Sequence, residues 1–158
     1  MANKLTPEDE PSLRDLAGFR YELRRFLQYS ESRAADAGLH PQQHQLLLQL
    51  AGVPYGEETT VSYAAERLGL RHHSVVELSK RCEEGGLINR IQDLNDRRRI
   101  QLQVTEKGRR VLRALSADHA RELHELAPRL IRSLALICGQ VKNNPRGRKM
   151  ARAGAGSR

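Results

Sequence analysis

The chain has 158 residues, of which 39% are hydrophobic, 29% are charged and 4% are aromatic, with no Trp. This length favours one domain with helical extensions and excludes large catalytic architectures such as the TIM barrel. The 27 basic and 19 acidic residues give a formal net charge of +8, which is typical of proteins that bind nucleic acids or anionic surfaces.

The cysteines and the apolar runs indicate the cellular location of the protein. Cys82 and Cys138 lack the spacing of a disulfide framework or a zinc knuckle, and we expect both to be buried and unreactive. The longest apolar run, residues 134–138, is far shorter than the roughly 20 residues that span a bilayer. The acidic N-terminus does not resemble a signal peptide. We therefore expect a cytoplasmic protein that binds no membrane, metal or cofactor.

Both ends of the chain, residues 1–10 and 141–158, are predicted to be disordered. The C-terminal segment contains basic residues and no acidic ones. It also lacks an apolar stripe that could pack. A solubilising tail and a phosphate-binding arm explain this composition equally well.

Residues 11–38 are predicted to form an amphipathic N-terminal helix. The apolar stripe advances in steps of three and four residues and comprises Leu16, Phe19, Leu23 and Phe26. Gly38 is suited to end this helix because glycine readily adopts the left-handed conformation. Such a narrow stripe packs on its own domain or against a second subunit, and both alternatives stay open.

Three shorter helices are predicted in the middle of the chain. The first begins at residue 41 and ends at residue 49 or 50, the second follows the N-cap Thr60 and extends to residue 68, and the third begins at His73 or Ser74. Their inward-facing residues include Leu46, Leu47 and Leu50 in the first helix and Val75, Leu78 and Cys82 in the third. The second and third helices, joined by a tight turn at Gly69, form a predicted helix-turn-helix.

A β-hairpin and a long C-terminal helical segment follow. Residues 87–93 form one predicted strand, residues 94–98 a polar turn, and Ile100, Leu102 and Val104 alternate with glutamines in a second strand. Thr105 caps the segment 106–140, in which Pro128 predicts either a kink or a junction of two helices. The apolar stripe of this segment comprises Leu112, Leu115, His119, Leu123, Leu126, Leu130, Leu134 and Ile137.

A helix-turn-helix followed by a basic hairpin is a winged helix, and this arrangement is typical of proteins that bind duplex DNA. The second helix of the motif fits the major groove, where each base pair presents its own donor and acceptor pattern. Its predicted outward residues are Arg71, His72, His73, Ser74, Val76, Glu77, Lys80 and Arg81. At the hairpin tip, Arg97, Arg98 and Arg99 can enter a narrow minor groove with a strongly negative potential.

These segments resemble the MarR family of winged-helix transcriptional regulators. Residues 65–70, 74–75 and 83–87 are similar to the helix-turn-helix of that family. Residues 96–108 are similar to its wing pattern, in which Asp-x-Arg is followed by an aliphatic residue and Thr-Glu-x-Gly. The resemblance implies a mainly α fold with a small β-hairpin wing, in which the DNA-binding domain spans residues 39–105.

The resemblance also implies a homodimer that binds a pseudo-palindromic operator and usually represses transcription until a ligand or oxidant intervenes. It implies that Arg98 enters the minor groove, that Asp96 braces it and that Arg97 is the competing tip residue. The flanking segments 11–38 and 106–140 would form the dimer through Leu16, Phe19, Leu23, Phe26, Leu126, Leu130, Leu134 and Ile137. A pocket for a small-molecule effector would lie between these helices and the winged helix.

Two residues depart from the family pattern. Glu77 lies where relatives often have Arg or a small polar residue, and it would repel phosphate or accept a hydrogen bond from a cytosine amino group. The family's peroxide sensors carry a Cys near the start of the first helix, whereas Cys82 of this chain occupies the position of a core Leu.

Other classes of function fit less well. The sequence has no nucleophile elbow, phosphate-binding glycine loop or metalloprotease motif, so no catalytic residue is predicted and an enzyme is not expected. His119 and His124 are spaced so that they face different sides of a helix, which argues against a metal site. A winged-helix module that binds protein or RNA is the alternative, although the low aromatic content argues against stacking on single-stranded RNA.

Overall fold

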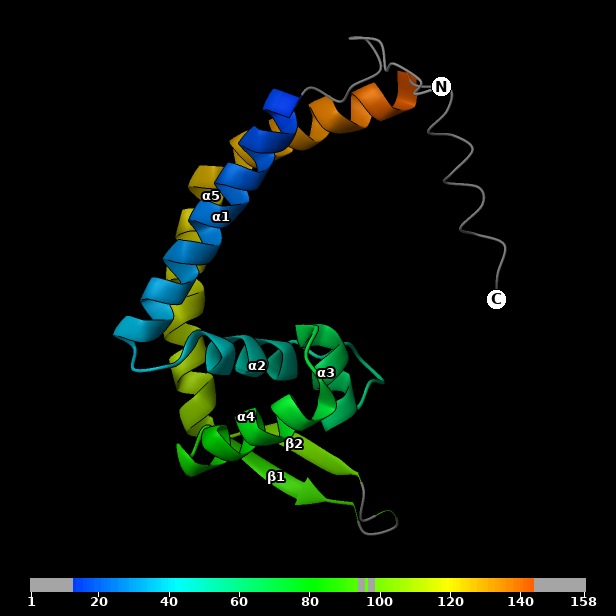
Figure 1. The fold of residues 1–158 in the computed structure, drawn as a ribbon. Helices are drawn as coiled ribbons and strands as arrows, with labels where there is room; N and C mark the ends of the chain where they lie inside the picture. Colours follow the sequence, from blue (N-terminus) through cyan, green and yellow to red (C-terminus); the bar gives the residue numbers. More distant parts are fainter. Residues whose placement is uncertain (1–12, 94–95, 97–98, 144–158) are drawn as a thin grey trace, which may run out of the picture. The chain divides into compact units, whose positions relative to one another are not determined.

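The computed structural model describes residues 13–93, 96 and 99–143, and in this part of the chain it contains five helices and one hairpin (Figure 1). The elements are α1 (Leu13–Asp36), α2 (Pro41–Ala51), α3 (Val61–Leu68), α4 (His72–Glu84), β1 (Ile88–Gln92), β2 (Ile100–Val104) and α5 (Glu106–Asn143). This order confirms the predicted mainly α fold with a small β-hairpin. None of the described helices is long and apolar enough to cross a membrane.

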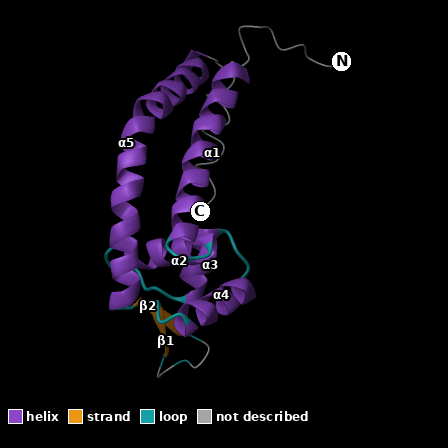
Figure 2. Ribbon diagram, turned by 90° about the vertical axis from the view of Figure 1, so that its left-hand side faces the viewer, coloured by secondary structure: helices purple, strands orange, loops and turns teal. Residues whose placement is uncertain are grey.

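The chain divides into two units, and each is described by itself. The described residues of the first unit are 13–28 and 121–143, where α1 and α5 run side by side in opposite directions (Figures 1 and 2). Within this unit, Glu22 pairs with Arg25 of its own helix and with Arg129 of α5, each at 3.6 Å. Leu126 is only 2% exposed. Among the described residues of this unit, it is the one apolar side chain that is buried.

The second unit, residues 29–120, contains α2, α3, α4 and the hairpin, together with the end of α1 and the beginning of α5 (Figure 2). The core of this unit includes the side chains that the helical periodicity predicts to face inward. Leu46, Leu47, Leu50, Val75, Leu78 and Cys82 are all buried. Hydrophobic burial on this scale is the main force that holds short helices together, because isolated helices of this length are marginal in water.

The predicted helix ends are confirmed at α1 and α3. Gly38 and Gly69 adopt positive φ angles of 75° and 63°, where a side chain would be strained. The Thr60 Oγ1 accepts a hydrogen bond from the Tyr63 N–H at 3.1 Å and caps α3. The sequence analysis missed the cap of α2, where the His40 Nδ1 accepts a hydrogen bond from the Gln42 N–H at 3.3 Å.

Helix α4 begins earlier than predicted. Its first residue is His72 rather than His73 or Ser74, and Arg71 is the N-cap, so Arg71 lies just outside the helix. The carbonyl of Arg71 accepts hydrogen bonds from the Ser74 and Val75 N–H groups. These bonds explain the earlier start, because a residue with an extended backbone can begin a helix through its carbonyl alone.

The hairpin is antiparallel and pairs Ile88 with Val104 through to Gln92 with Ile100. The first strand is therefore two residues shorter than predicted: the Leu87 N–H bonds to the Cys82 carbonyl of α4, and the strand ends at Gln92, although the Asp93 N–H still donates to the Arg99 carbonyl at 3.0 Å. Most of the predicted turn, residues 94, 95, 97 and 98, lies outside the described residues.

Helix α5 is one continuous helix with Pro128 inside it. The alternative of two C-terminal helices that meet at this proline is therefore wrong, while a kink there stays a prediction. Thr105 caps the helix as predicted, because its Oγ1 accepts a hydrogen bond from the Gly108 N–H at 3.1 Å. The expectation of a buried Cys138 is also wrong. This residue is exposed on α5 and does not belong to the apolar stripe of that helix.

Candidate nucleic-acid interface

Helix α4 has a buried face and an exposed polar face that carries both basic and acidic side chains. Val75, Leu78, Ser79 and Cys82 are buried, and burial raises the pKa of the Cys82 thiol to about 11, which confirms this cysteine as a core residue. The exposed residues of the predicted interface are Arg71, His72, His73, Glu77, Lys80 and Arg81. Ser74 is only partly exposed, and Val76 packs partly against the core rather than facing freely outward as predicted.

The N-terminus of α4 combines backbone and side-chain positive charge. No side chain caps the helix at Arg71; the Ser74 and Val75 N–H groups bond to the Arg71 carbonyl, whereas the very first N–H groups of a helix have no partner within the helix. Arg71, His72 and His73 are all exposed around this end. An anion is stabilised at such a position by the N–H groups and by the helix dipole.

Glu77 is engaged by a neighbour on the same helix. Its Oε1 lies 2.7 Å from the Nζ of Lys80, and both side chains are largely exposed. The hydrogen bond and charge of Lys80 lower the pKa of Glu77, so the carboxylate stays ionised. The side chain that the sequence analysis considered as a free acceptor for cytosine therefore already has a partner in the protein.

The hairpin is attached to the rest of the unit along both strands. On β1, the Glu83 Oε1 of α4 accepts a hydrogen bond from the Arg90 N–H at 2.9 Å. On β2, the Leu102 N–H donates to the Thr59 carbonyl at 2.7 Å, and Thr60 forms a bridge with Gln101. These contacts join the helix-turn-helix to the wing, and the sequence analysis missed them because each joins residues from separate elements.

The base of the wing carries Arg99, the third arginine of the predicted hairpin tip. The Arg99 guanidinium forms an ion pair with Glu58, which precedes α3, and the Arg99 N–H donates to the Asp96 carbonyl at 2.9 Å. The Asp96 N–H donates to the Asp93 Oδ1 at 3.2 Å. Arg97 and Arg98 lie outside the described residues, so the predicted bracing of Arg98 by Asp96 stays a prediction.

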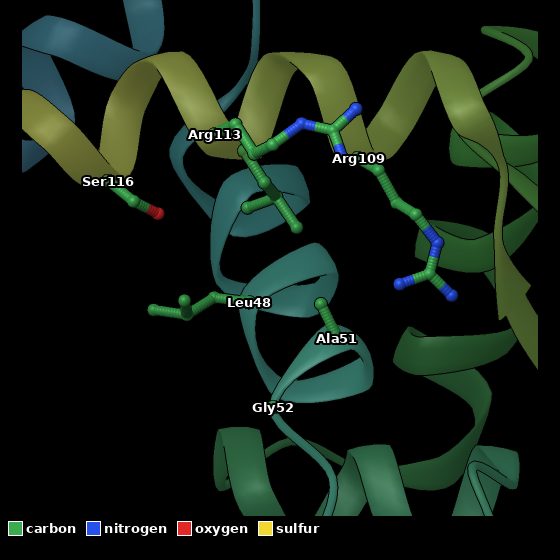
Figure 3. A pocket seen from close by; sticks show the side chains of 7 residues that line it. Leu48, Ala51, Gly52, Arg109, Arg113 and Ser116 are labelled. Atoms are coloured by element: carbon green, nitrogen blue, oxygen red, sulfur yellow. The ribbon is translucent and has the colours of Figure 1, made fainter.

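A pocket of about 400 Å³ lies between α2 and the beginning of α5. Figure 3 shows Leu48 and Ala51 on α2 facing the side of α5 that carries Arg109, Arg113 and Ser116. The Arg113 guanidinium donates a hydrogen bond to Glu106 at 2.6 Å. The pocket thus combines an apolar surface with basic groups and a hydroxyl, as small-molecule sites do.

The unit also contains two buried histidines, of which the sequence analysis placed only His119 on an apolar stripe. His44 is 2% exposed and His119 is 9% exposed. No group of three or more His, Cys, Asp or Glu side chains suited to a metal ion occurs among the described residues. The two histidines belong to the packing of α1, α2 and α5.

Comparisons with known proteins agree with this architecture. A model of the MarR family matches residues 37–99. AbsC, a MarR family transcriptional regulator from Streptomyces coelicolor, is 18% identical, with a TM-score of 0.64 over 90% of this chain and 100% of that one. The MepR–DNA complex of S. aureus is 21% identical, with a TM-score of 0.61 over 71% of this chain and 80% of that one. No match was found among curated proteins.

A third structure is CouR from Rhodococcus jostii RHA1 bound to p-coumaroyl-CoA, which is 22% identical over 72% of this chain and 83% of that one, with a TM-score of 0.54. The described elements define a winged helix-turn-helix protein, because the consecutive helices α3 and α4 are followed directly by a two-stranded wing. The family model narrows the resemblance: it matches the segment that contains most of this winged helix, in agreement with the similarity to the MarR family found in the sequence.

Proposed function

We propose that this protein is a DNA-binding transcriptional regulator that contacts the major groove through α4 and the minor groove through its wing. The observation that carries the proposal is the set of exposed basic side chains at α4, Arg71, Lys80 and Arg81, on a helix that is attached through Glu83 to the hairpin that follows it. The described interface residues are Arg71, His72, His73, Ser74, Glu77, Lys80, Arg81, Asp96 and Arg99, with Arg97 and Arg98 proposed from the sequence.

The experiment is a titration of fluorescent duplex from the upstream region of its own gene, with excess random duplex as competitor and a series of salt concentrations. Arg71→Ala should weaken binding and flatten the slope of log affinity against log salt by about one unit. Arg132→Ala, which removes an exposed arginine from the other unit, is the control and should change neither quantity. Binding that random duplex abolishes would favour the alternative module that binds protein or RNA.

A homodimer is the proposed state of assembly. The unit formed by residues 13–28 and 121–143 exposes apolar side chains that water disfavours, including Leu23 at 40% and Leu134 at 44% exposure. Ile131 and Leu136 are further exposed apolar side chains of α5, and Leu16, Phe19, Phe26, Leu130 and Ile137 of the predicted interface are partly exposed. Leu126 is already buried in the single chain, so we assign it to internal packing rather than to the partner.

Two such chains related by a two-fold axis would present two α4 helices to successive major grooves, and the proposed operator is therefore pseudo-palindromic. A dimer bound across a promoter excludes other proteins from the same DNA, and repression is the direction that we propose. Transcription from a reporter with this operator should fall when the protein is added and rise when the operator is scrambled.

The pocket between α2 and α5 is the proposed site for a small-molecule effector. Its volume is within the range of about 300–1,000 Å³ that is usual for ligand sites. Arg109 and Arg113 favour a ligand that carries an acidic group. A screen of organic acids for release of the labelled operator tests this site, with Arg109→Ala as the variant that should lose the response.

A further inference from the structure

Two acidic side chains hold basic residues of the proposed DNA surface. Glu77 pairs with Lys80 at 2.7 Å on α4, and Glu58 pairs with Arg99 at the base of the wing. In both pairs each side chain is between 47% and 64% exposed, so both pairs are accessible to solvent. The two pairs belong to the two elements that the proposed function brings to DNA.

We propose that Glu58 and Glu77 compete with DNA phosphates for Arg99 and Lys80 and thereby lower the affinity of the protein for the DNA backbone. This inference rests on the proposed function. A carboxylate and a phosphate offer the same kind of anionic oxygen to guanidinium and ammonium donors, so one can replace the other. When DNA binds, each basic side chain exchanges its carboxylate for a phosphate, and the complex forms at the expense of an existing ion pair.

The solvent exposure of both ion pairs limits how far they can lower the affinity for DNA. An exposed ion pair changes an equilibrium constant by no more than about fivefold, so phosphates along a duplex can displace it. Glu77 also lies on the same helix as Arg71 and Arg81, where an unpaired carboxylate would repel the backbone. Lys80 compensates this charge in the free protein, and the exchange leaves the Glu77 charge near the DNA.

Matched variants test the role of each carboxylate. Glu58→Gln and Glu77→Gln remove one negative charge and keep the shape of the side chain. Glu57→Gln and Glu84→Gln are the controls, because these residues are exposed neighbours on the same segments. Each test variant should raise affinity for a random-sequence duplex by up to about fivefold more than its control, and should steepen the salt slope by up to about one unit.

Double variants show whether each carboxylate acts through its basic partner. In an Arg99→Gln background, Glu58→Gln should lose its effect on both affinity and salt slope. In a Lys80→Gln background, Glu77→Gln should keep only the effect of removing a charge that repels DNA, which Glu84→Gln in the same background measures. If a carboxylate instead only held its basic partner in place, its single Gln variant would weaken DNA binding without changing the salt slope.

The possible results separate failure of the proposed competition from failure of the proposed function. If Glu58→Gln and Glu77→Gln match their controls, or if they weaken binding at every salt concentration, the competition is overturned while the proposed function stands. If the unaltered protein binds neither random nor upstream duplex, the proposed function is overturned and this inference with it. The competition between carboxylate and phosphate is established if Glu58→Gln and Glu77→Gln change affinity and salt slope more than their controls do, and if this excess vanishes in the double variants.

Discussion

His44 of α2 and His119 of α5 lie with their ring centroids 5.0 Å apart and their planes tilted by 50°. A third ring, that of Tyr29 on α1, approaches His119 edge-on at 6.3 Å. Both histidines are nearly inaccessible to water. The end of α1 and parts of α2 and α5 are thus held together by a buried cluster that contains two titratable groups.

We predict that the stability of the protein falls in mild acid because of this pair. Burial lowers the pKa of His44, and His119 lowers it further. Burial also lowers the pKa of His119, while the Ser30 backbone and Asp118 oppose the shift and Arg33 reinforces it. The folded protein therefore keeps both rings neutral where the unfolded chain takes up protons, at about pH 6.5. The folding free energy is undiminished above that pH and falls below it.

Thermal unfolding between pH 5 and 8 measures the effect. The loss should reach up to about 1.4 kcal/mol per pH unit for each histidine. His44→Gln and His119→Gln should each reduce this slope, whereas His72→Gln, which alters an exposed histidine, should not. An unchanged slope in both of the buried variants would show that other groups cause the acid sensitivity.

A second prediction concerns Gly108, at the beginning of α5. A Cβ at this position would lie 2.8 Å from the Val104 Cγ1 and closer still to the Leu87 carbonyl oxygen, which belongs to the backbone. Gly108→Ala should therefore cost about 1–3 kcal/mol and lower the melting temperature by about 2–4 °C for each kcal/mol.

Gly139→Ala is the matched control for Gly108→Ala. Gly139 is an exposed residue of the same helix, and nothing lies within 4 Å of an added Cβ. Alanine should stabilise the protein there by about 0.5–1 kcal/mol, because it is the better helix former. A melting temperature for Gly108→Ala at or above that of the unaltered protein would contradict the close contact.

The sequence predicts the parts of this structure that depend on periodicity and local end signals. The steps of three and four residues identify the buried side of α4 through Val75, Leu78 and Cys82, and Gly69 marks the end of α3. These features involve residues within a few positions of one another. Their packing follows because an apolar stripe must be buried somewhere.

The contacts that adjust the candidate site could not be predicted in the same way. Glu58 and Arg99 are 41 positions apart, and the pairing of their side chains depends on how the segment before α3 meets β2. His44 is a polar residue in a short helix, and it lies buried against the ring of His119 on α5. Cys138 lies close to the apolar stripe of α5 in sequence, yet its direction around the helix leaves it exposed.

The two cysteines give a third prediction. Cys82 is buried with a pKa of about 11, so at pH 8 only about one thiol in a thousand is ionised. Cys138 is exposed. A thiol reagent such as DTNB should therefore modify one cysteine per chain in the native protein and two in denaturant. Cys138→Ser should abolish the native reaction, and a persistent rapid reaction in this variant would contradict the burial of Cys82.

The fourth prediction tests the dimer surface. Leu134→Glu and Leu23→Glu place a charge on the exposed apolar side of the unit formed by residues 13–28 and 121–143, where a partner would have to desolvate it. The sedimentation coefficient should fall from the value of a dimer to that of a monomer, and binding to the proposed pseudo-palindromic operator should weaken because a monomer holds only one half-site.

Tyr55→Glu is the control for these dimer variants, because Tyr55 is a fully exposed side chain in the loop between α2 and α3 and belongs to the other unit. It adds the same charge and removes an exposed apolar group, so it should leave the sedimentation coefficient unchanged. Leu126 is unsuitable for the test, since its burial within the chain means that a charge there would unfold the unit. A dimer that survives both leucine variants would place the interface elsewhere on the chain.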